Sequence, residues 1–217
     1  MTVNAPWLKS YGNVPHSLDY PDCSMAQLVF KAAEKYPNVI AYEFFGCKTN
    51  YLVFANEIRQ CARGLIAVGI KKADRVTICM PNTPQAVIMF YALNLIGSVA
   101  NMVHPLSAED ELVGYLKDSN SVAVLTLDQF ASKLEAIIPR TKVGLLILSG
   151  VDDGLEGIKK PLYRLTKGRN IERRLSGGKV LRYSDLMIRG EEALPLPESC
   201  VQGDGDNVAA ILYSGGT

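Results

Sequence analysis

Ser214, Gly215, Gly216 and Thr217 combine two hydroxyl side chains with two glycines, directly after an apolar run. Glycine lets a backbone approach an anion closely and turn its N–H groups toward it, and hydroxyls add further donors. These residues therefore favour phosphate binding. The G-x-x-x-x-G-K-[ST] spacing of a Walker A loop is absent, and Gly-Gly after a strand is also common as a simple turn. Both interpretations stay open on these four residues alone.

The residues before this loop form a continuous apolar run, from Val208 to Tyr213, which follows the turn-rich stretch Gly203 to Asp206. A run without alternation predicts a buried strand rather than a half-exposed one. The loop would then stand at the carboxyl end of a strand, where ligands bind in open α/β sheets. The order of strand and loop therefore matters as much as the composition of the loop.

Other residues that could perform chemistry are sparse. The two histidines, His16 and His104, lie far apart in the sequence, and the cysteines form no C-x-x-C pair. A zinc site or a Cys–His nucleophile therefore has little support. An odd number of irregularly spaced cysteines suits buried free thiols in a reducing cytosol. The five cysteines are Cys23, Cys47, Cys61, Cys79 and Cys200.

Length and charge narrow the class of protein. The 217 residues are 48% hydrophobic, which is enough for a sizeable core, and the net charge of +1 gives no field that would attract nucleic acid. The first ten residues do not resemble a signal peptide, and no apolar stretch approaches the roughly 20 residues that span a bilayer. We expect a cytoplasmic protein.

The pattern between residues 24 and 150 alternates strands with helices, which is typical of parallel βαβ units. We therefore expect an α/β fold, with a doubly wound, mainly parallel sheet flanked by helices. Strands are expected at residues 40–45, 75–80, 98–103, 122–126 and 143–148, and helices at residues 25–36, 51–68, 83–96, 108–120 and 129–138. A hairpin turn is expected at residues 46–49, and the helix at 83–96 is apolar on nearly every side.

Local signals support the ends of these elements. Ser24 can cap the first helix, and the stretch from Pro81 to Pro84 is typical of a turn between strand and helix with an N-cap, although a substrate contact is the alternative. Three acidic residues from Glu109 open a helix, where they favour its dipole. His104 could face a ligand at the end of the sheet, or could be a satisfied structural residue.

The chain divides into four parts. Residues 1–23 are expected to be an irregular arm laid over the domain surface, residues 24–150 the βαβ core, residues 151–179 a basic insertion, and residues 180–217 a return to the sheet that ends in the loop. The insertion could contact anionic lipid or could be a solvated charged segment. Its cations are Lys159, Lys160, Arg164, Lys167, Arg169, Arg173 and Arg174.

Three stretches resemble motifs of the AMP-forming acyl-CoA synthetases, within the adenylate-forming superfamily. Residues 74–85, DRVTICMPNTPQ, resemble a segment written G-D-R-V-x-I-x-x-P-N-x-P-E, with Ala73 and Gln85 as departures. Residues 95–106, followed by Glu-Leu, resemble a helix-to-strand segment, with Ser98 in place of alanine. Residues 213–217 resemble the first half of the phosphate loop Y-T-S-G-T-T-G-x-P-K. The opening arm is similar to that of long-chain fatty-acid CoA ligases.

The resemblance implies an enzyme that activates a carboxylic acid, expected to be a fatty acid, with ATP and magnesium to give an acyl-adenylate, and then transfers the acyl group to coenzyme A. It implies that the ATP phosphates are held by Tyr213, Ser214, Gly215, Gly216 and Thr217. Ser214 is the candidate oxygen ligand for magnesium. No general base is needed, because a carboxylate is already a nucleophile.

The resemblance also implies that the sequence ends inside the phosphate loop. The adenine pocket, the acyl tunnel and the catalytic lysine of the family would lie beyond Thr217, so we expect no turnover from these 217 residues alone. Surfaces that the remainder would cover would be apolar, which predicts self-association. One alternative is a non-catalytic module that binds a nucleotide or a protein, and binding of ATP by the chain alone would favour it. Within the family, the other alternative is an adenylation enzyme for another carboxylate.

Overall fold

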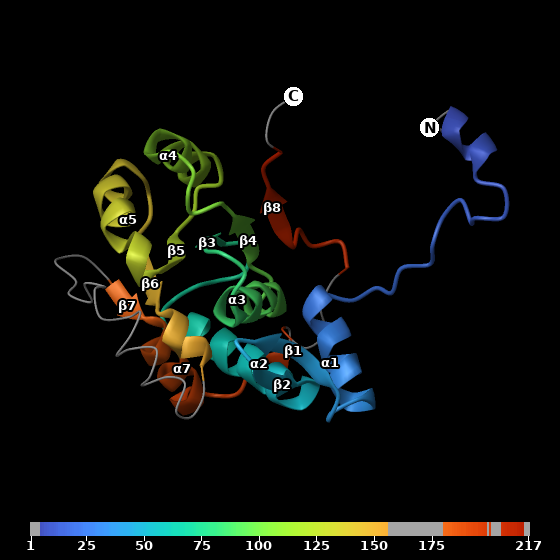
Figure 1. Ribbon diagram of the computed structural model, residues 1–217, viewed down its shortest axis with the longest axis horizontal. Helices are drawn as coiled ribbons and strands as arrows, with labels where there is room; N and C mark the ends of the chain where they lie inside the picture. Colours follow the sequence, from blue (N-terminus) through green and yellow to red (C-terminus); the bar gives the residue numbers. More distant parts are fainter. Residues whose placement is uncertain (1–4, 156–179, 199, 201–204, 215–217) are drawn as a thin grey trace.

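A parallel sheet of six strands forms the centre of the protein (Figure 1). The computed structural model describes residues 5–155, 180–198, 200 and 205–214. The strand order is β7-β6-β5-β3-β4-β8, and each neighbouring pair is parallel, so the predicted doubly wound sheet is confirmed. The strands are β3 (Arg75–Cys79), β4 (Val99–Met102), β5 (Ala123–Leu127), β6 (Leu145–Ser149), β7 (Val180–Arg182) and β8 (Ala210–Leu212).

Helices cover both faces of this sheet and divide the core in two. The first core joins the sheet to helices α1, α2, α3 and α7, and the second joins its other face to α4 and α5. Helix α3 lies between the sheet and α1 and α2, which explains why it is apolar all round. The bounds are α1 (Met25–Lys35), α2 (Tyr51–Ala67), α3 (Pro84–Leu95), α4 (Glu109–Asp118), α5 (Ala131–Ile137) and α7 (Tyr183–Glu192).

Side-chain caps fix where two of these helices begin. The Ser24 hydroxyl accepts a hydrogen bond from the Gln27 N–H at 3.3 Å, and the Gln27 side chain accepts one from the Ser24 N–H at 2.8 Å. The Thr83 hydroxyl accepts from the Ala86 N–H at 3.3 Å, with Pro84 in the first turn. These bonds satisfy N–H groups that lack partners within the helix. The predictions of an N-cap at Ser24 and of a capped turn before α3 are therefore confirmed.

A separate hairpin joins β1 (Ile40–Phe44) to β2 (Cys47–Asn50). Its turn consists of Phe45 and Gly46, which both have positive φ, at 49° and 73°. The predicted turn at residues 46–49 was wrong, because most of those residues form β2. A two-residue turn with both φ values positive matches the twist of the flanking strands, and it allows pairing to resume directly at Cys47.

The amino-terminal arm extends away from the body of the protein (Figure 1). It begins with a short 3-10 helix, η1 (Pro6–Ser10), in which no residue is buried, and Trp7 and Tyr20 are 57% and 80% exposed. The expectation that the arm lies over the domain surface was wrong. Its prolines prevent a regular helix or strand, so it offers no continuous apolar face that could pack against the domain.

Strands β7 and β8 lie at opposite edges of the sheet, although the chain passes from one to the other after α7.

The basic patch predicted at residues 159–174 lies outside the described residues. In the part of the chain that the structure describes, no helix has both the length and the apolar character needed to cross a membrane.

Candidate functional site

The predicted phosphate loop begins where strand β8 ends, at the carboxyl edge of the sheet. Strand β8 pairs in parallel with β4, with Ala210 opposite Ala100 and Leu212 opposite Met102. All strands of a parallel sheet end at the same edge, so residues that follow β8 emerge beside those that follow β4 and β3. The structure therefore brings Ser214 to the same edge as the turn before α3, as the sequence predicts.

Tyr213 fixes the end of β8 to helix α4. Its hydroxyl donates a hydrogen bond to the backbone oxygen of Tyr115 at 3.2 Å, and the two rings lie 4.1 Å apart with a tilt of 33°. Burial raises the pKa of Tyr213, the charge of Asp118 raises it further, and hydrogen bonds with Ser119 and Asn101 lower it. The phenol is therefore neutral and turned toward α4. The prediction that Tyr213 holds phosphate then depends on its backbone.

A buried polar network lies beneath this contact. The Asn101 Nδ2 donates to the Thr77 hydroxyl at 2.8 Å and to the Ser119 hydroxyl at 3.1 Å. The Ser121 hydroxyl lies 2.7 Å from both of those hydroxyl oxygens. Such a network links β3, β4 and the residues after α4 into one arrangement. Sequence reasoning missed it, although Thr77 and Asn101 are polar residues inside strands that were expected to be buried.

Ser214 is the last described residue of the predicted loop, and its side chain is exposed. No hydrogen bond engages its hydroxyl within the described residues, which leaves that oxygen available to a ligand. Gly215, Gly216 and Thr217 lie outside the described residues. Across the described ranges, no group of three or more His, Cys, Asp or Glu residues stands close enough to hold a metal ion.

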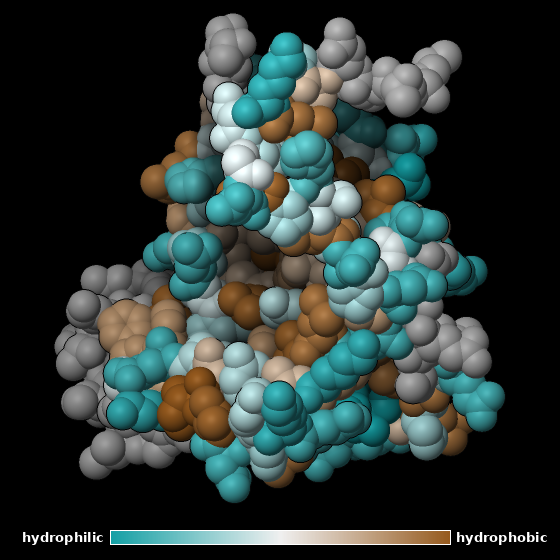
Figure 2. Space-filling model, turned by 90° about the vertical axis from the view of Figure 1, so that its right-hand side faces the viewer, coloured by the Kyte–Doolittle hydropathy of each residue, from teal (hydrophilic) through white to brown (hydrophobic). Residues whose placement is uncertain are grey.

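Strand β8 itself is more exposed than predicted. Val208 and Leu212 are 62% and 75% exposed, and Ala210 and Ile211 are only half-buried. The prediction of a buried strand was wrong because β8 lies at the sheet edge, where β4 is its single strand partner among the described residues. Figure 2 shows apolar surface in a hollow on the side of the molecule that faces right in Figure 1. The predicted self-association stays a prediction.

The other candidate residues at this edge have structural roles. His104 is exposed, and its Nδ1 accepts a hydrogen bond from the Leu106 N–H at 3.2 Å, which closes a turn. The Glu111 carboxylate accepts from the Ala108 N–H at 3.1 Å at the start of α4. These geometries agree with the structural interpretation of both residues. Of the candidate residues that the structure describes at this edge, Ser214 has an exposed hydroxyl that makes no hydrogen bond to the described residues.

Two cysteines are deeply buried, and their thiols are unreactive. Burial raises the pKa of both Cys61 and Cys79 from 9.0 to about 12. A hydrogen bond with Tyr183 lowers the pKa of Cys61 by a smaller amount, and the charge of Lys133 does the same for Cys79. Their thiols are therefore protonated at neutral pH and poor nucleophiles. All five cysteines are free, as predicted, but the other three are half-buried rather than buried.

A second buried polar group was missed by the sequence analysis. Gln85 is 1% exposed, and neither its Oε1 nor its Nε2 has a hydrogen-bond partner among the described residues. Its amide lies close to Gly154, where an added Cβ would stand 2.9 Å from Nε2. The only sequence signal was the departure from glutamate at this position. A carboxylate in the same place would be a buried charge without a hydrogen-bond partner among the described residues.

The sequence of this chain is similar to those of known proteins. A family model described as AMP-binding enzyme matches residues 29–217. The chain is 28% identical to a long-chain-fatty-acid–CoA ligase of Bacillus subtilis (strain 168) over 220 residues, which cover 100% of this chain and 39% of that ligase. The chain thus spans well under half the length of this relative.

Two solved structures share the fold. A long-chain-fatty-acid–CoA ligase from Archaeoglobus fulgidus superposes with a TM-score of 0.67 and 23% identity, covering 93% of this chain and 36% of that one. An anthranilate CoA ligase in complex with anthranoyl-AMP superposes with a TM-score of 0.71 and 16% identity, covering 91% and 33%. At these identities the likeness establishes the fold alone.

Proposed function

The chain belongs to the family of AMP-binding enzymes, and we propose that it forms the part of an acid–CoA ligase that begins the phosphate loop. The complete enzyme would convert a carboxylic acid and ATP into an acyl-adenylate and pyrophosphate, and would then form a thioester with coenzyme A. A long-chain fatty acid is the proposed substrate, because the Bacillus subtilis ligase matches the whole of this chain.

The observation that carries this proposal is the anchored end of β8. Tyr213 is held by its ring and its hydroxyl against Tyr115, so the chain leaves the sheet at a defined point. Ser214 follows with an exposed hydroxyl, and Gly215, Gly216 and Thr217 come next in the sequence. A loop that leaves the carboxyl end of a parallel strand is where α/β sheets bind ligands.

The chemistry assigned to this loop is electrostatic. The carboxylate oxygen of the acid attacks the α-phosphorus of ATP, the bond to the bridging oxygen breaks, and pyrophosphate leaves with its added charge. The Ser214 hydroxyl and the following backbone amides would hold the β- and γ-phosphates while this charge builds. The coenzyme A sulfur then attacks the acyl carbon, AMP leaves, and the thiol proton passes to solvent. Bound magnesium would neutralise phosphate charge, with Ser214 as a candidate ligand.

We also propose that the 217-residue chain has no ligase turnover alone. The chain covers 39%, 36% and 33% of the length of the three relatives described above, so most of each relative has no counterpart in these 217 residues. Purified chain that formed acyl-CoA steadily from ATP, palmitate and coenzyme A would contradict this part of the proposal.

The test of the ligase function is a chimera in which residues 1–217 replace the matching part of the Bacillus subtilis ligase. The readout is exchange of pyrophosphate into ATP, which reports adenylation without coenzyme A. We expect exchange that depends on palmitate. Replacing Ser214 with Ala should remove one hydrogen bond to a charged group, worth about 1.5–3 kcal/mol, and so slow exchange by a factor of about 10 to 150.

The matched control is Ser184→Ala, which changes an exposed serine on α7 and should leave exchange unchanged. A chimera that melts cooperatively but exchanges no pyrophosphate with palmitate, octanoate, benzoate or 4-coumarate would refute the proposed function. Equal rates in the Ser214→Ala and Ser184→Ala chimeras would remove Ser214 from the phosphate site.

A further inference from the structure

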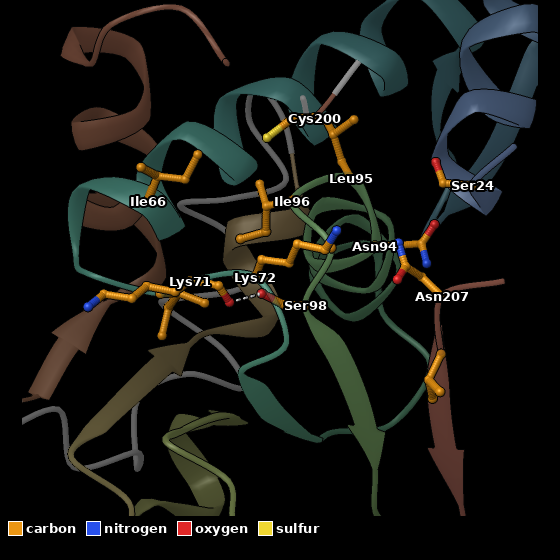
Figure 3. Close-up of a pocket in the computed structure, with 13 residues that line it drawn as sticks. Ser24, Ile66, Lys71, Lys72, Asn94, Leu95, Ile96, Ser98, Cys200 and Asn207 are labelled. Atoms are coloured by element: carbon orange, nitrogen blue, oxygen red, sulfur yellow. Dashed lines mark hydrogen bonds between the residues drawn. The ribbon is translucent and has the colours of Figure 1, made fainter. Parts of the chain in front are cut away.

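A cavity of about 510 Å³ opens at the amino edge of the sheet, the edge opposite Ser214 (Figure 3). It lies where α2 and α3 end and where β4 begins, between Ile70, Asn94 and Ser98. A second hollow of about 400 Å³ shares Lys72 and Asn207 with it. We call the first cavity the amino-edge pocket. Its volume lies within the range of about 300–1,000 Å³ that is typical of ligand sites.

Lys72 is directed into this pocket by its backbone surroundings. A Cβ added at Gly97 would stand 3.0 Å from the Lys72 Cγ, so the lysine stem packs on the glycine. Gly97 has a φ of +71°, which a residue with a side chain rarely adopts. In Figure 3 the Lys72 side chain runs toward Asn94 and Asn207, whereas Lys71 points away. Among the described residues the Lys72 ammonium has no carboxylate partner.

Asn94 supplies a second donor. It is 8% exposed, and its Oδ1 accepts a hydrogen bond from the Ala26 N–H at 3.1 Å, so the amide orientation is set. The Nδ2 then faces the pocket with no partner among the described residues. Among the described residues no acidic side chain lines the pocket, and the nearby Asp74 carboxylate accepts a hydrogen bond from the Lys71 N–H at 2.8 Å. Lys71 also lines the pocket, but its ammonium points away from it in Figure 3, so the side chains of Lys72 and Asn94 supply the donors on the polar side of the pocket.

The remaining wall is apolar. Ile66, Ile70, Leu95 and Ile96 line it, and Val208 stands at its rim with 62% of its surface exposed. The carboxyl ends of α2 and α3 also point here, and their partial negative charge opposes an anion. The favourable charge must therefore come from Lys72. A donor-rich side that faces an apolar wall is complementary to a molecule with an anionic head and an apolar tail.

We propose that the amino-edge pocket binds an amphiphilic anion, a carboxylate or phosphate group on an alkyl chain, with its head on Lys72 and Asn94 and its tail along Ile66 and Ile96. This site is separate from the proposed phosphate loop, because the two lie at opposite edges of the sheet. The inference therefore does not depend on the proposed ligase function. It requires only the residues of the pocket.

The experiment is calorimetric titration of the 217-residue chain with decanoate and with decyl phosphate, below their micelle concentrations. Decanol, which lacks the charge, and inorganic phosphate, which lacks the tail, are the comparison ligands. We expect one molecule of decanoate or of decyl phosphate to bind per chain, and inorganic phosphate not to bind. The stronger of the two anions identifies the head group.

Lys72→Met keeps the apolar stem and removes the charge, and Lys71→Met is its matched control. We expect Lys72→Met to weaken binding of the anion at least tenfold, Lys71→Met to leave it unchanged, and binding of decanol to be equal in all three proteins. Both variants change exposed side chains, and equal melting temperatures would establish that they fold.

Three results would overturn the inference. The first is that neither anion binds at millimolar concentration. The second is that the two lysine variants weaken binding equally, which would indicate a diffuse charge effect. The third is loss of decanoate binding in Ser214→Ala, which would place the ligand at the phosphate-loop edge. Retention of decanoate binding in that variant, whatever the outcome of the chimera experiment, keeps the two proposals distinguishable.

Discussion

Helices α2 and α7 approach each other through a pair of glycines, and this contact predicts a large effect of a single methyl group. A Cβ added at Gly190 would stand 1.9 Å from the Gln60 backbone oxygen, and one added at Gly64 would stand 2.3 Å from the Leu186 backbone oxygen. Ordinary contacts begin near 3.4 Å. Gly190→Ala therefore forces the two helices apart by roughly 1.5 Å, because no rotamer change can move a backbone oxygen.

Two opposing terms set the size of the effect. Alanine is favoured over glycine inside a helix by about 1 kcal/mol. Forcing a group into a packed core costs about 1–3 kcal/mol, and a backbone clash belongs at or above the upper end of that range. The contact also holds the Gln60 side chain on the Met187 oxygen at 3.0 Å, which would be stretched. We expect Gly190→Ala to lower the free energy of unfolding by about 2 kcal/mol.

The chain contains its own control for this prediction. Gly114 lies inside α4, and a Cβ added there would meet nothing within 4 Å. Gly114→Ala should therefore stabilise the protein by about 0.5–1 kcal/mol. Urea and thermal unfolding measure both effects, and for a chain of this size about 2 kcal/mol corresponds to a melting temperature lower by about 4–8 °C. Equal stability changes for Gly190→Ala and Gly114→Ala would refute the reasoning.

Three further predictions concern single contacts. Ser24→Ala removes the cap of α1 and should lower the free energy of unfolding in urea by about 1 kcal/mol. Tyr213→Phe keeps the stacked ring but loses the hydroxyl bond, which should cost about 0.5–1.5 kcal/mol in the same assay, whereas Tyr20→Phe on the exposed arm should cost nothing measurable. The raised pKa of Cys61 and Cys79, about 12 for each, means that thiols ionise in the unfolded chain before they ionise in the folded one. Stability should therefore be constant below pH 9 and fall as the pH rises toward 12, by up to about 1.4 kcal/mol per pH unit for each thiol, and Cys61→Ala should reduce the slope.

The parts of the fold that the sequence predicted depend on short-range physics. The alternation of continuous apolar segments with segments of helical periodicity predicted the order of strands and helices. The caps at Ser24 and Thr83 determine where two helices begin. These signals act within a few residues, so a single sequence contains them in full. The structure differs by one or two residues at most ends of these elements, which is the usual fraying of helix and strand termini.

The parts that the sequence did not predict depend on partners far along the chain. The burial of Leu212 depends on which residues pack beyond the edge of the sheet, and an apolar run does not indicate whether any do. The hairpin turn was misplaced because Phe45, an aromatic residue, adopts a positive φ that sequence rules assign to glycine or asparagine. The network around Asn101 was missed because three separate segments supply its amide and its hydroxyls.

The structure also separates the roles of two residues in the proposed phosphate loop. Its composition suggested that Tyr213 and Ser214 act together on a ligand, but the structure gives their side chains different tasks. Tyr213 is turned toward α4 and shares hydrogen-bond partners with the buried network, so it positions the loop. Ser214, one residue later, is exposed and available. Fixing Tyr213 before a ligand arrives lowers the cost of ordering the proposed loop, because each backbone residue that must be ordered on binding costs about 1–2 kcal/mol. The aromatic residue before the glycines is therefore part of the affinity of the proposed site, although its side chain faces away from the ligand.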